Sequence, residues 1–225
     1  AQELAGQLAK MEPEKSGLSD WQRARLGKIT ASHFGDVKYL KSGAWGETAL
    51  TYLYDLIGEH LTGQPSESFT GSKATEWGNQ YEEEALMAYK QRTGRKTTLG
   101  HFLQDPKNPL VGGTPDAFCG EQGVLEIKCP FNFKNHLRTV ITKKVPDDYK
   151  SQVLGHLMLS GREWCDFVSY DPRIKSQHRL VIVRVKAKEV QAEMDELAQR
   201  IIDFHKLLLK QLEVLKIKSI HPIKF

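Results

Sequence analysis

Two acidic residues and one lysine stand close together in the middle of the chain, within 112–131. Alternate residues of a β-strand share a face, so Glu126 and Lys128 point to the same side of a strand predicted over 124–129. Asp116 lies on a predicted partner strand, and a turn at 120–123 allows it to approach Glu126. The same pattern fits an exposed hairpin with solvated ion pairs. The prolines and apolar residues around it instead favour a strand that ends at a site.

A third carboxylate is expected from a helix nearer the N-terminus. Helical spacing over 75–93 puts Glu82 on a stripe of otherwise apolar or small residues, whereas Glu83 and Glu84 lie off that stripe. A carboxylate that faces a core is costly without a partner. We therefore expect Glu82 to face the same site as the other two acids.

The charges of these four residues do not balance. Asp116, Glu126 and Glu82 carry three negative charges against one positive charge, and two like charges about 4 Å apart repel by about 4 kcal/mol at an effective dielectric of 20. A divalent cation offsets this repulsion, and oxygen ligands favour Mg²⁺, with Mn²⁺ as a substitute, over Zn²⁺. The chemistry implied is metal-assisted hydrolysis of a phosphoryl group, with Lys128 orienting water or neutralising charge in the transition state.

Composition limits the class of protein that carries this site. The chain has 225 residues, 40% of them hydrophobic and 27% charged, which predicts one domain over 1–225 with a loose leader at 1–15. No apolar run reaches the length of a membrane span and no signal-peptide core is present, so we expect a cytoplasmic protein with no membrane contact. Three cysteines without a CxxC pair support neither a disulfide framework nor a zinc site. The net charge of +4 is too small to indicate a nucleic-acid partner by itself.

The elements around the site predict an α/β (α+β) protein with a central mixed sheet flanked by helices. Periodicity and turn residues place the elements in chain order. The expected helices begin at Thr30 or Ser32 and run to about 39, then cover 47–61, 75–93, 146–161 and a long amphipathic segment within 187–225. The expected strands cover 99–103, 111–119, 124–129, 165–170 and 179–185, with a basic loop over 131–144.

Several motifs together resemble a known family. Pro115-Asp116, followed ten residues later by Glu126-Ile127-Lys128, resembles the PD-(D/E)xK nuclease motif. With LGKITAS at 26–32, WGNQYEEEA at 77–85, LEIKCPF at 125–131 and YKSQVLGHLML at 149–159, the chain resembles the phage lambda exonuclease and YqaJ-type viral recombinase family over about 21–172. The resemblance implies a restriction-endonuclease-like core.

The resemblance also implies an activity. Members of this family digest one strand of linear double-stranded DNA from its 5′ end with Mg²⁺, leaving a 3′ single strand for an annealing protein, and they form a ring-shaped homotrimer. By matching motifs, Asp116, Glu126, Glu82 and the carbonyl of Ile127 would bind the metal, and Lys128 would be the catalytic lysine. The later helix of the family supplies a glutamine, here Gln152. The residue four positions on is His156 where the family has tyrosine, which leaves its role open.

Other residues are candidates for contacts to DNA. Arg25 and Ser32 match the family's pocket for a 5′ phosphate, with Thr114 as a further candidate, because an arginine beside a hydroxyl-capped helix N-terminus can bind an anion. The alternative is that Ser32 only caps its helix and Arg25 is a surface charge. Lys134 and Arg138, in the basic loop, can contact phosphates or be solvated.

Two other functions fit part of the pattern. A site-specific or structure-specific endonuclease shares the core motif but needs recognition elements for which the chain has little length. A non-catalytic DNA-binding module is disfavoured because both acids and the lysine are present. A P-loop and a GxSxG elbow are both missing from the sequence.

Overall fold

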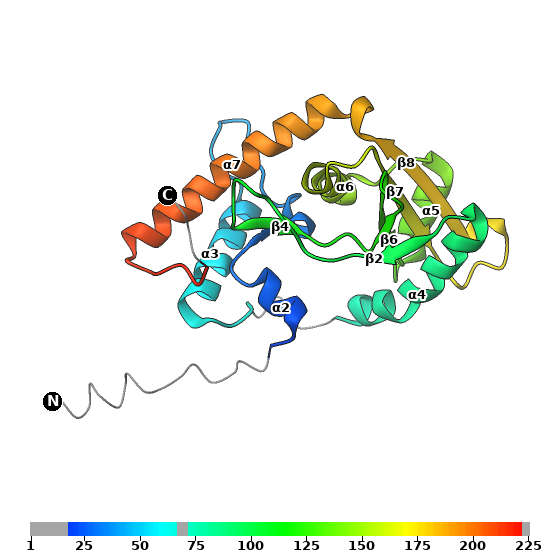
Figure 1. The fold of residues 1–225 in the computed structure, drawn as a ribbon, viewed down its shortest axis with the longest axis horizontal. Helices are drawn as coiled ribbons and strands as arrows, with labels where there is room; N and C mark the ends of the chain where they lie inside the picture. Colours follow the sequence, from blue (N-terminus) through cyan, green and yellow to red (C-terminus); the bar gives the residue numbers. More distant parts are fainter. Residues whose placement is uncertain (1–17, 67–71, 222–225) are drawn as a thin grey trace.

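The computed structural model describes residues 18–66 and 72–221, so the predicted leader at 1–15 lies outside the described residues. A five-stranded mixed sheet lies on the right-hand side of the molecule in the view of Figure 1. Its order is β2-β5-β6-β7-β8, and the pair β6–β7 is parallel while the other pairs are antiparallel. The strands are β2 (Thr97–Leu99), β5 (Ala117–Cys119), β6 (Gly123–Lys128), β7 (Trp164–Tyr170) and β8 (Leu180–Lys186).

Strand β6 is the centre of this sheet and carries the predicted acid and lysine. Its residues alternate between the two faces, with Val124 in the hydrophobic cluster on one side and Leu125 and Ile127 in the cluster on the other. A strand buried on both faces is apolar throughout, as Val, Leu and Ile are here. Glu126, which is fully buried, is therefore an exception that needs polar partners.

Helices cover both faces of the sheet. Helix α4 (Lys73–Thr93) packs on one face through Ala85 and Tyr89. On the other face lie α6 (Asp147–Ser160), α3 (Glu47–Thr62) and the long α7 (Gln191–Val214), which share one hydrophobic cluster with the sheet (Figure 1). This arrangement confirms the predicted class, a mixed sheet flanked by helices.

A second, smaller sheet lies beside the first. It joins β1 (Ile29–Thr30), β4 (Val111–Gly113) and β3 (Leu103–Gln104), with β1 parallel to β4. The short helix α2 (Asp20–Arg25) precedes it and begins with a capping box between Ser19 and Gln22, which the sequence analysis did not predict. The 3₁₀ turn η1 (Ala31–His33) follows β1.

Four predictions about elements are wrong. The strand expected over 111–119 is two strands in different sheets, because Pro115 has no N–H to donate and the chain crosses from one sheet to the other there. The strand expected over 99–103 is likewise divided into β2 and β3, and the only helical structure at Thr30 is the three-residue η1 rather than a helix to 39. The basic loop is largely a helix, α5 (Phe133–Thr142).

The other predicted elements are confirmed. Helices α3, α4 and α6 each end at a left-handed glycine, and the β5–β6 hairpin turns at 120–122. The short η3 (Gln177–Arg179) and η4 (Ala187–Glu189) flank β8. All three cysteines are buried free thiols. Across the described ranges we find no helix that is both long and apolar enough to cross a bilayer.

Candidate active site

A cleft with a volume of about 1080 Å³ brings most of the predicted site residues together. Its walls come from α2 with η1, the N-terminal half of α4, the end of β2 at 99–100, the β4–β5 connection with β6, and α6. Eight of the predicted residues line it, namely Arg25, Ser32, Glu82, Thr114, Asp116, Glu126, Lys128 and Gln152.

The two acids and the lysine are joined by short contacts. The Nζ atom of Lys128 lies 2.5 Å from Oε1 of Glu126. The other carboxylate oxygen of Glu126, Oε2, lies 2.8 Å from Nε2 of His156. Asp116 Oδ2 accepts a hydrogen bond from the backbone N–H of Ile127 at 2.5 Å. The predicted approach of Asp116 to strand β6 is therefore present, and it runs through the backbone of β6.

The pKa values of the two carboxyl groups move in opposite directions. Burial and the neighbouring charge of Glu126 raise the pKa of Asp116 above its ordinary value. Burial acts in the same sense on Glu126, but Lys128 and His156 outweigh it and lower the pKa of Glu126 to about 2. Burial would lower the pKa of Lys128, yet Glu126 and Asp116 raise it, so the ammonium stays charged. Positive neighbours thus outweigh burial at Glu126, whereas at Asp116 the charge of Lys128 does not.

Glu82 lies at the cleft, but it is not buried. The side chain is exposed, so the expectation that it faces a core is wrong, because the stripe of α4 that packs on the sheet is held by Ala85 and Tyr89 instead. Desolvation at the cleft and the charge of Glu126 raise its pKa, against the opposing effect of Lys128. Glu82 therefore contributes a third carboxylate to the wall of the cleft.

The oxygen donors at the cleft are of the type that binds a hard divalent cation. Among the described residues, no group of three or more His, Cys, Asp and Glu side chains is close enough to hold a metal ion. The carboxylates of Asp116 and Glu126 come from neighbouring chain segments, and burial with the charge of Glu126 outweighs the effect of Lys128 on the pKa of Asp116. Further positive charge beside Asp116 would favour its ionised form. Oxygen donors of this kind suit Mg²⁺ or Mn²⁺. A cation held by Asp116 and Glu126 would supply that charge, while roles for Glu82 and the Ile127 carbonyl stay predictions.

Arg25 forms the opposite wall of the cleft. It is half-buried, its guanidinium stacks 4.4 Å from the ring centroid of Trp21, and burial lowers its pKa. Its Nε and Nη1 atoms are buried and have no hydrogen-bond partner within the part of the chain that the structure describes. Buried donors are normally paired, so this guanidinium is prepared for an anion.

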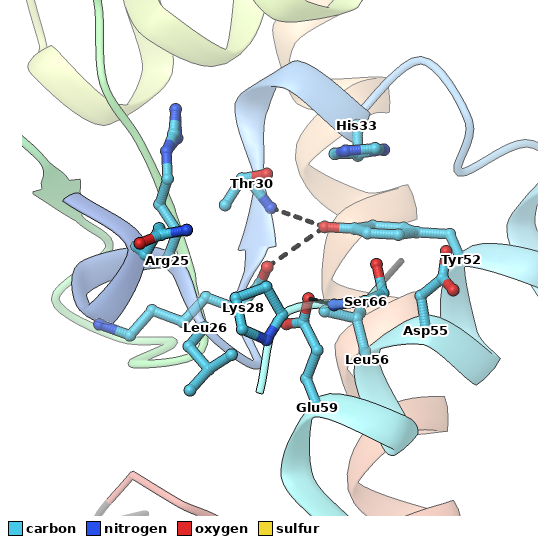
Figure 2. A pocket seen from close by; sticks show the side chains of 12 residues that line it. Arg25, Leu26, Lys28, Thr30, His33, Tyr52, Asp55, Leu56, Glu59 and Ser66 are labelled. Atoms are coloured by element: carbon cyan, nitrogen blue, oxygen red, sulfur yellow. Dashed lines mark hydrogen bonds between the residues drawn. The ribbon is translucent and has the colours of Figure 1, made fainter. Parts of the chain in front are cut away.

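A buried tyrosine holds the backbone of strand β1, which follows Arg25 in the chain. Tyr52 accepts a hydrogen bond from the N–H of Thr30 at 3.0 Å and donates one to the carbonyl of Lys28 at 3.2 Å, while His33 stacks on its ring (Figure 2). Arg25 is one of the residues that line a small cavity of about 30 Å³ beside this network (Figure 2). The network fixes β1 next to the cleft.

The other two predicted phosphate contacts, Ser32 and Thr114, also line the cleft. Ser32 is exposed, and its hydroxyl lies 3.1 Å from that of Thr30. Neither hydroxyl caps a long helix, because η1 has three residues and Thr30 makes no side-chain cap bond. The helix N-terminus that was part of the predicted anion pocket is therefore missing, and Arg25 remains its main donor.

Helix α6 supplies residues that sequence reasoning assigned only in part. Gln152 is half-buried and lines the cleft, and His156, one turn further on, is buried against Glu126. The structure therefore gives His156 a partner. Tyr149 was missed, although it lies three residues before Gln152 and so shares its face of the helix. Its ring centroid is 5.3 Å from the Lys128 ammonium.

The two basic residues predicted to contact DNA lie elsewhere. Lys134 and Arg138 are exposed on α5, and neither lines the cleft. A role in holding DNA stays a prediction for both.

Comparisons with known proteins bear on this site. The sequence profile of the YqaJ-like viral recombinase domain matches residues 20–163. An alkaline exonuclease from Laribacter hongkongensis is similar in structure, with a TM-score of 0.78 and 32% identity over 87% of this chain and 95% of that one. The same enzyme in complex with dAMP gives a TM-score of 0.74 and 30% identity over 87% and 97%. A phage-related exonuclease from Haemophilus somnus 129PT shares the fold, with a TM-score of 0.61 and 17% identity over 82% and 96%. No curated protein sequence matches the chain.

Proposed function

The chain belongs to the YqaJ-like viral recombinase domain family, and from that premise we propose that it is a metal-dependent DNA exonuclease. It digests one strand of linear double-stranded DNA in the 5′-to-3′ direction with Mg²⁺, or Mn²⁺ as a substitute, and leaves a 3′ single-stranded overhang. The similarity to an alkaline exonuclease over nearly the whole of both chains supports a nuclease. The polarity, the metal and the overhang are the finer parts of the proposal.

One observation carries the proposal. A single cleft is lined by the half-buried Arg25, whose Nε and Nη1 atoms have no hydrogen-bond partner among the described residues. The same cleft is lined by the half-buried Asp116, the buried Glu126 and Lys128. Arginine recognises a phosphate through several parallel hydrogen bonds. A terminal 5′ phosphate at Arg25, with Ser32 and Thr114 nearby, would place the adjoining nucleotide towards Asp116, Glu126 and Lys128.

Each residue of the cleft then has a separate role in hydrolysis. A bound Mg²⁺ supplies polarisation of the phosphoryl oxygen and a water of lowered pKa. Lys128, kept charged by Glu126 and Asp116, offsets the negative charge that develops on the phosphate. Gln152 lines the same cleft and can hydrogen-bond to water or to a phosphate oxygen. Glu82 adds a negative group that helps to hold the cation.

The remaining parts of the proposal concern partners. We place the protein in the cytoplasm of a bacterial host, encoded by a phage or prophage, where a single-strand annealing protein takes the 3′ overhang. A ring-shaped homotrimer would hold the duplex, and Lys134 and Arg138 would contact its phosphates. These statements are supported by the family resemblance, and Lys134 and Arg138 also by their exposure.

Digestion of end-labelled DNA tests the proposal. Linear duplex labelled at either the 5′ or the 3′ ends is incubated with the wild type and with Lys128→Ala, in Mg²⁺ and in EDTA, beside a closed circular duplex of the same sequence. We expect Mg²⁺-dependent loss of the 5′ label with the wild type only, and an intact circle. Cleavage of the circle would indicate an endonuclease, and binding without cleavage in Mg²⁺ would indicate a DNA-binding module.

A further inference from the structure

A second depression continues from the cleft on the side away from Arg25. It has a volume of about 380 Å³, and it shares Thr75, Asn79, Glu82 and Lys128 with the cleft. Its other walls are the N-terminal turns of α4 and the segment from Cys129 to the start of α5. We call it the α5 groove. It carries none of the phosphate-pocket candidates Arg25, Ser32 and Thr114.

An aromatic ring stands at the edge of the α5 groove. Phe131 is 49% exposed, and its ring packs edge-on against Trp77 with a centroid distance of 5.8 Å. Trp77 in turn packs against Tyr81 at 4.4 Å. One side of the Phe131 ring is therefore supported, while about half of the side chain remains open to solvent.

The backbone that carries Phe131 is fixed by Arg173, an exposed residue paired with a buried acid. Arg173 Nη2 donates hydrogen bonds to the carbonyl oxygens of Phe131 at 3.1 Å and Pro130 at 3.3 Å. The same guanidinium pairs with Asp171, which is fully buried, at 2.7 Å, and it lies 4.6 Å from the ring centroid of Trp77. An exposed ring held this firmly loses little conformational freedom when it stacks on a planar ligand.

The groove has polar groups that suit nucleic acid, and a basic surface lies beside it. The segment 129–146 contains four Lys and Arg residues and no acidic residue; all four are exposed, although none of them lines the groove. The amide side chains of Asn79, Asn132 and Asn135 line the groove next to Phe131. Aromatic rings that stack on bases beside a positively charged surface are typical of sites for single-stranded nucleic acid.

We infer that the α5 groove binds the unpaired nucleotides on the 3′ side of the bond being cut, with a base stacked on Phe131. The inference rests on the proposed function. If the terminal phosphate binds at Arg25 and the scissile phosphate lies at Asp116 and Glu126, the rest of the strand leaves the cleft along one continuous path. That path passes Glu82 and Lys128, which line both the cleft and the groove. The groove thus holds the strand that is digested, apart from its partner.

A fluorescent base tests this assignment. A 5′-phosphorylated duplex with 2-aminopurine as the second nucleotide is titrated with protein in Ca²⁺, and each sample is checked on a gel for the absence of cleavage. Base stacking in the duplex quenches 2-aminopurine, and stacking on an aromatic ring keeps it quenched after the nucleotide leaves the duplex. The test variant is Phe131→Leu, which keeps packing against Trp77 but removes the π-face. The matched control is Phe133→Leu, because Phe133 has the same exposure of about half but does not line the groove.

We expect quenching with the wild type and with Phe133→Leu, and its loss with Phe131→Leu, together with binding that is about 10-fold weaker, as removal of one stacked base implies. Phe131→Trp should restore the quenching. Equal signals from Phe131→Leu and the wild type would overturn the assignment, and so would a change of oligomeric mass in Phe131→Leu, which would assign the ring to a contact between copies.

Digestion of the same duplex in Mg²⁺ is measured in parallel. Failure of the wild type to digest it would contradict the proposed function, whereas digestion without a Phe131 effect would contradict the groove alone.

Discussion

Arg25→Ala should weaken the selection of 5′-phosphorylated ends. Two guanidinium atoms of Arg25, Nε and Nη1, are buried without a partner among the residues described. A hydrogen bond to a charged group contributes about 1.5–3 kcal/mol. We take the lower value for each of the two donors because the cleft is open to water, which gives about 3 kcal/mol. Since 1.4 kcal/mol corresponds to a factor of ten, kcat/KM on 5′-phosphorylated duplex should fall about 100-fold.

The assay compares two variants on two substrates. kcat/KM is measured for the wild type, Arg25→Ala and Arg25→Lys on linear duplexes that differ only in a 5′ phosphate or a 5′ hydroxyl. Arg25→Ala should lose activity on the phosphate end and change little on the hydroxyl end. Arg25→Lys keeps the charge without the planar fork, so its loss should be intermediate. An equal loss on both ends would refute the reasoning, provided that thermal unfolding shows Arg25→Ala to be folded despite the lost stack on Trp21.

Three further predictions concern stability. Asp116→Asn should raise the free energy of unfolding in EDTA by about 1 kcal/mol, or Tm by about 2–4 °C, because it removes a half-buried carboxyl group whose pKa is raised by burial and by the charge of Glu126. It should also abolish activity and stabilisation by Mg²⁺, and a lower Tm in EDTA would contradict this reasoning. Burial lowers the pKa of His60 from 6.5 to about 4, so the unfolded chain binds more protons and the free energy of unfolding should fall as pH drops from about 6.5 to about 4. Denaturant titrations should show that the free energy of unfolding falls less over this pH range in His60→Gln than in the wild type. An equal pH dependence in the two proteins would contradict the assignment to His60. Gly112→Ala should lower the free energy of unfolding by about 1–3 kcal/mol, because a Cβ there would lie 2.3 Å from the Phe102 ring and 2.6 Å from the Leu103 carbonyl oxygen. A Tm equal to that of the wild type would contradict this and show that the ring moves freely.

The core of the site could be predicted because it obeys local geometry. Strand alternation places Glu126 and Lys128 on one face, and their side chains are indeed in contact. The hairpin turn at 120–122 brings Asp116 beside β6, as expected. These relations depend on residues that are close in sequence, so they can be predicted from the sequence alone.

The partners of these residues depend on contacts between distant segments. His156 reaches Glu126 across 30 positions of sequence, and Tyr149 approaches Lys128 only because α6 packs against β6. The exposure of Glu82 follows from how α4 is rotated on the sheet, which the spacing of its own residues did not fix.

Helix α5 shows how an element can be missed. Its basic residues favoured a loop, although Phe133, Leu137 and Ile141 recur every four residues. In the structure those three are exposed, and the buried face is polar, with His136 bonded to Ser169 Oγ and to the carbonyl of His178 at 2.8 Å each. Apolar periodicity predicts the buried face of a helix only where apolar residues make the contact.

The order in which labels leave a linear duplex tests the central claim most directly. Wild-type protein in excess is mixed with a 5′-phosphorylated duplex whose ends carry different labels, and Mg²⁺ starts a single turnover. If Arg25 holds the terminal phosphate and Asp116, Glu126 and Lys128 act on the adjoining bond, the 5′ label should appear first, in a small 5′-phosphorylated product, while the 3′ label stays on a long strand. Release of the 3′ label first, or internal fragments that carry neither end, would contradict this account of the cleft.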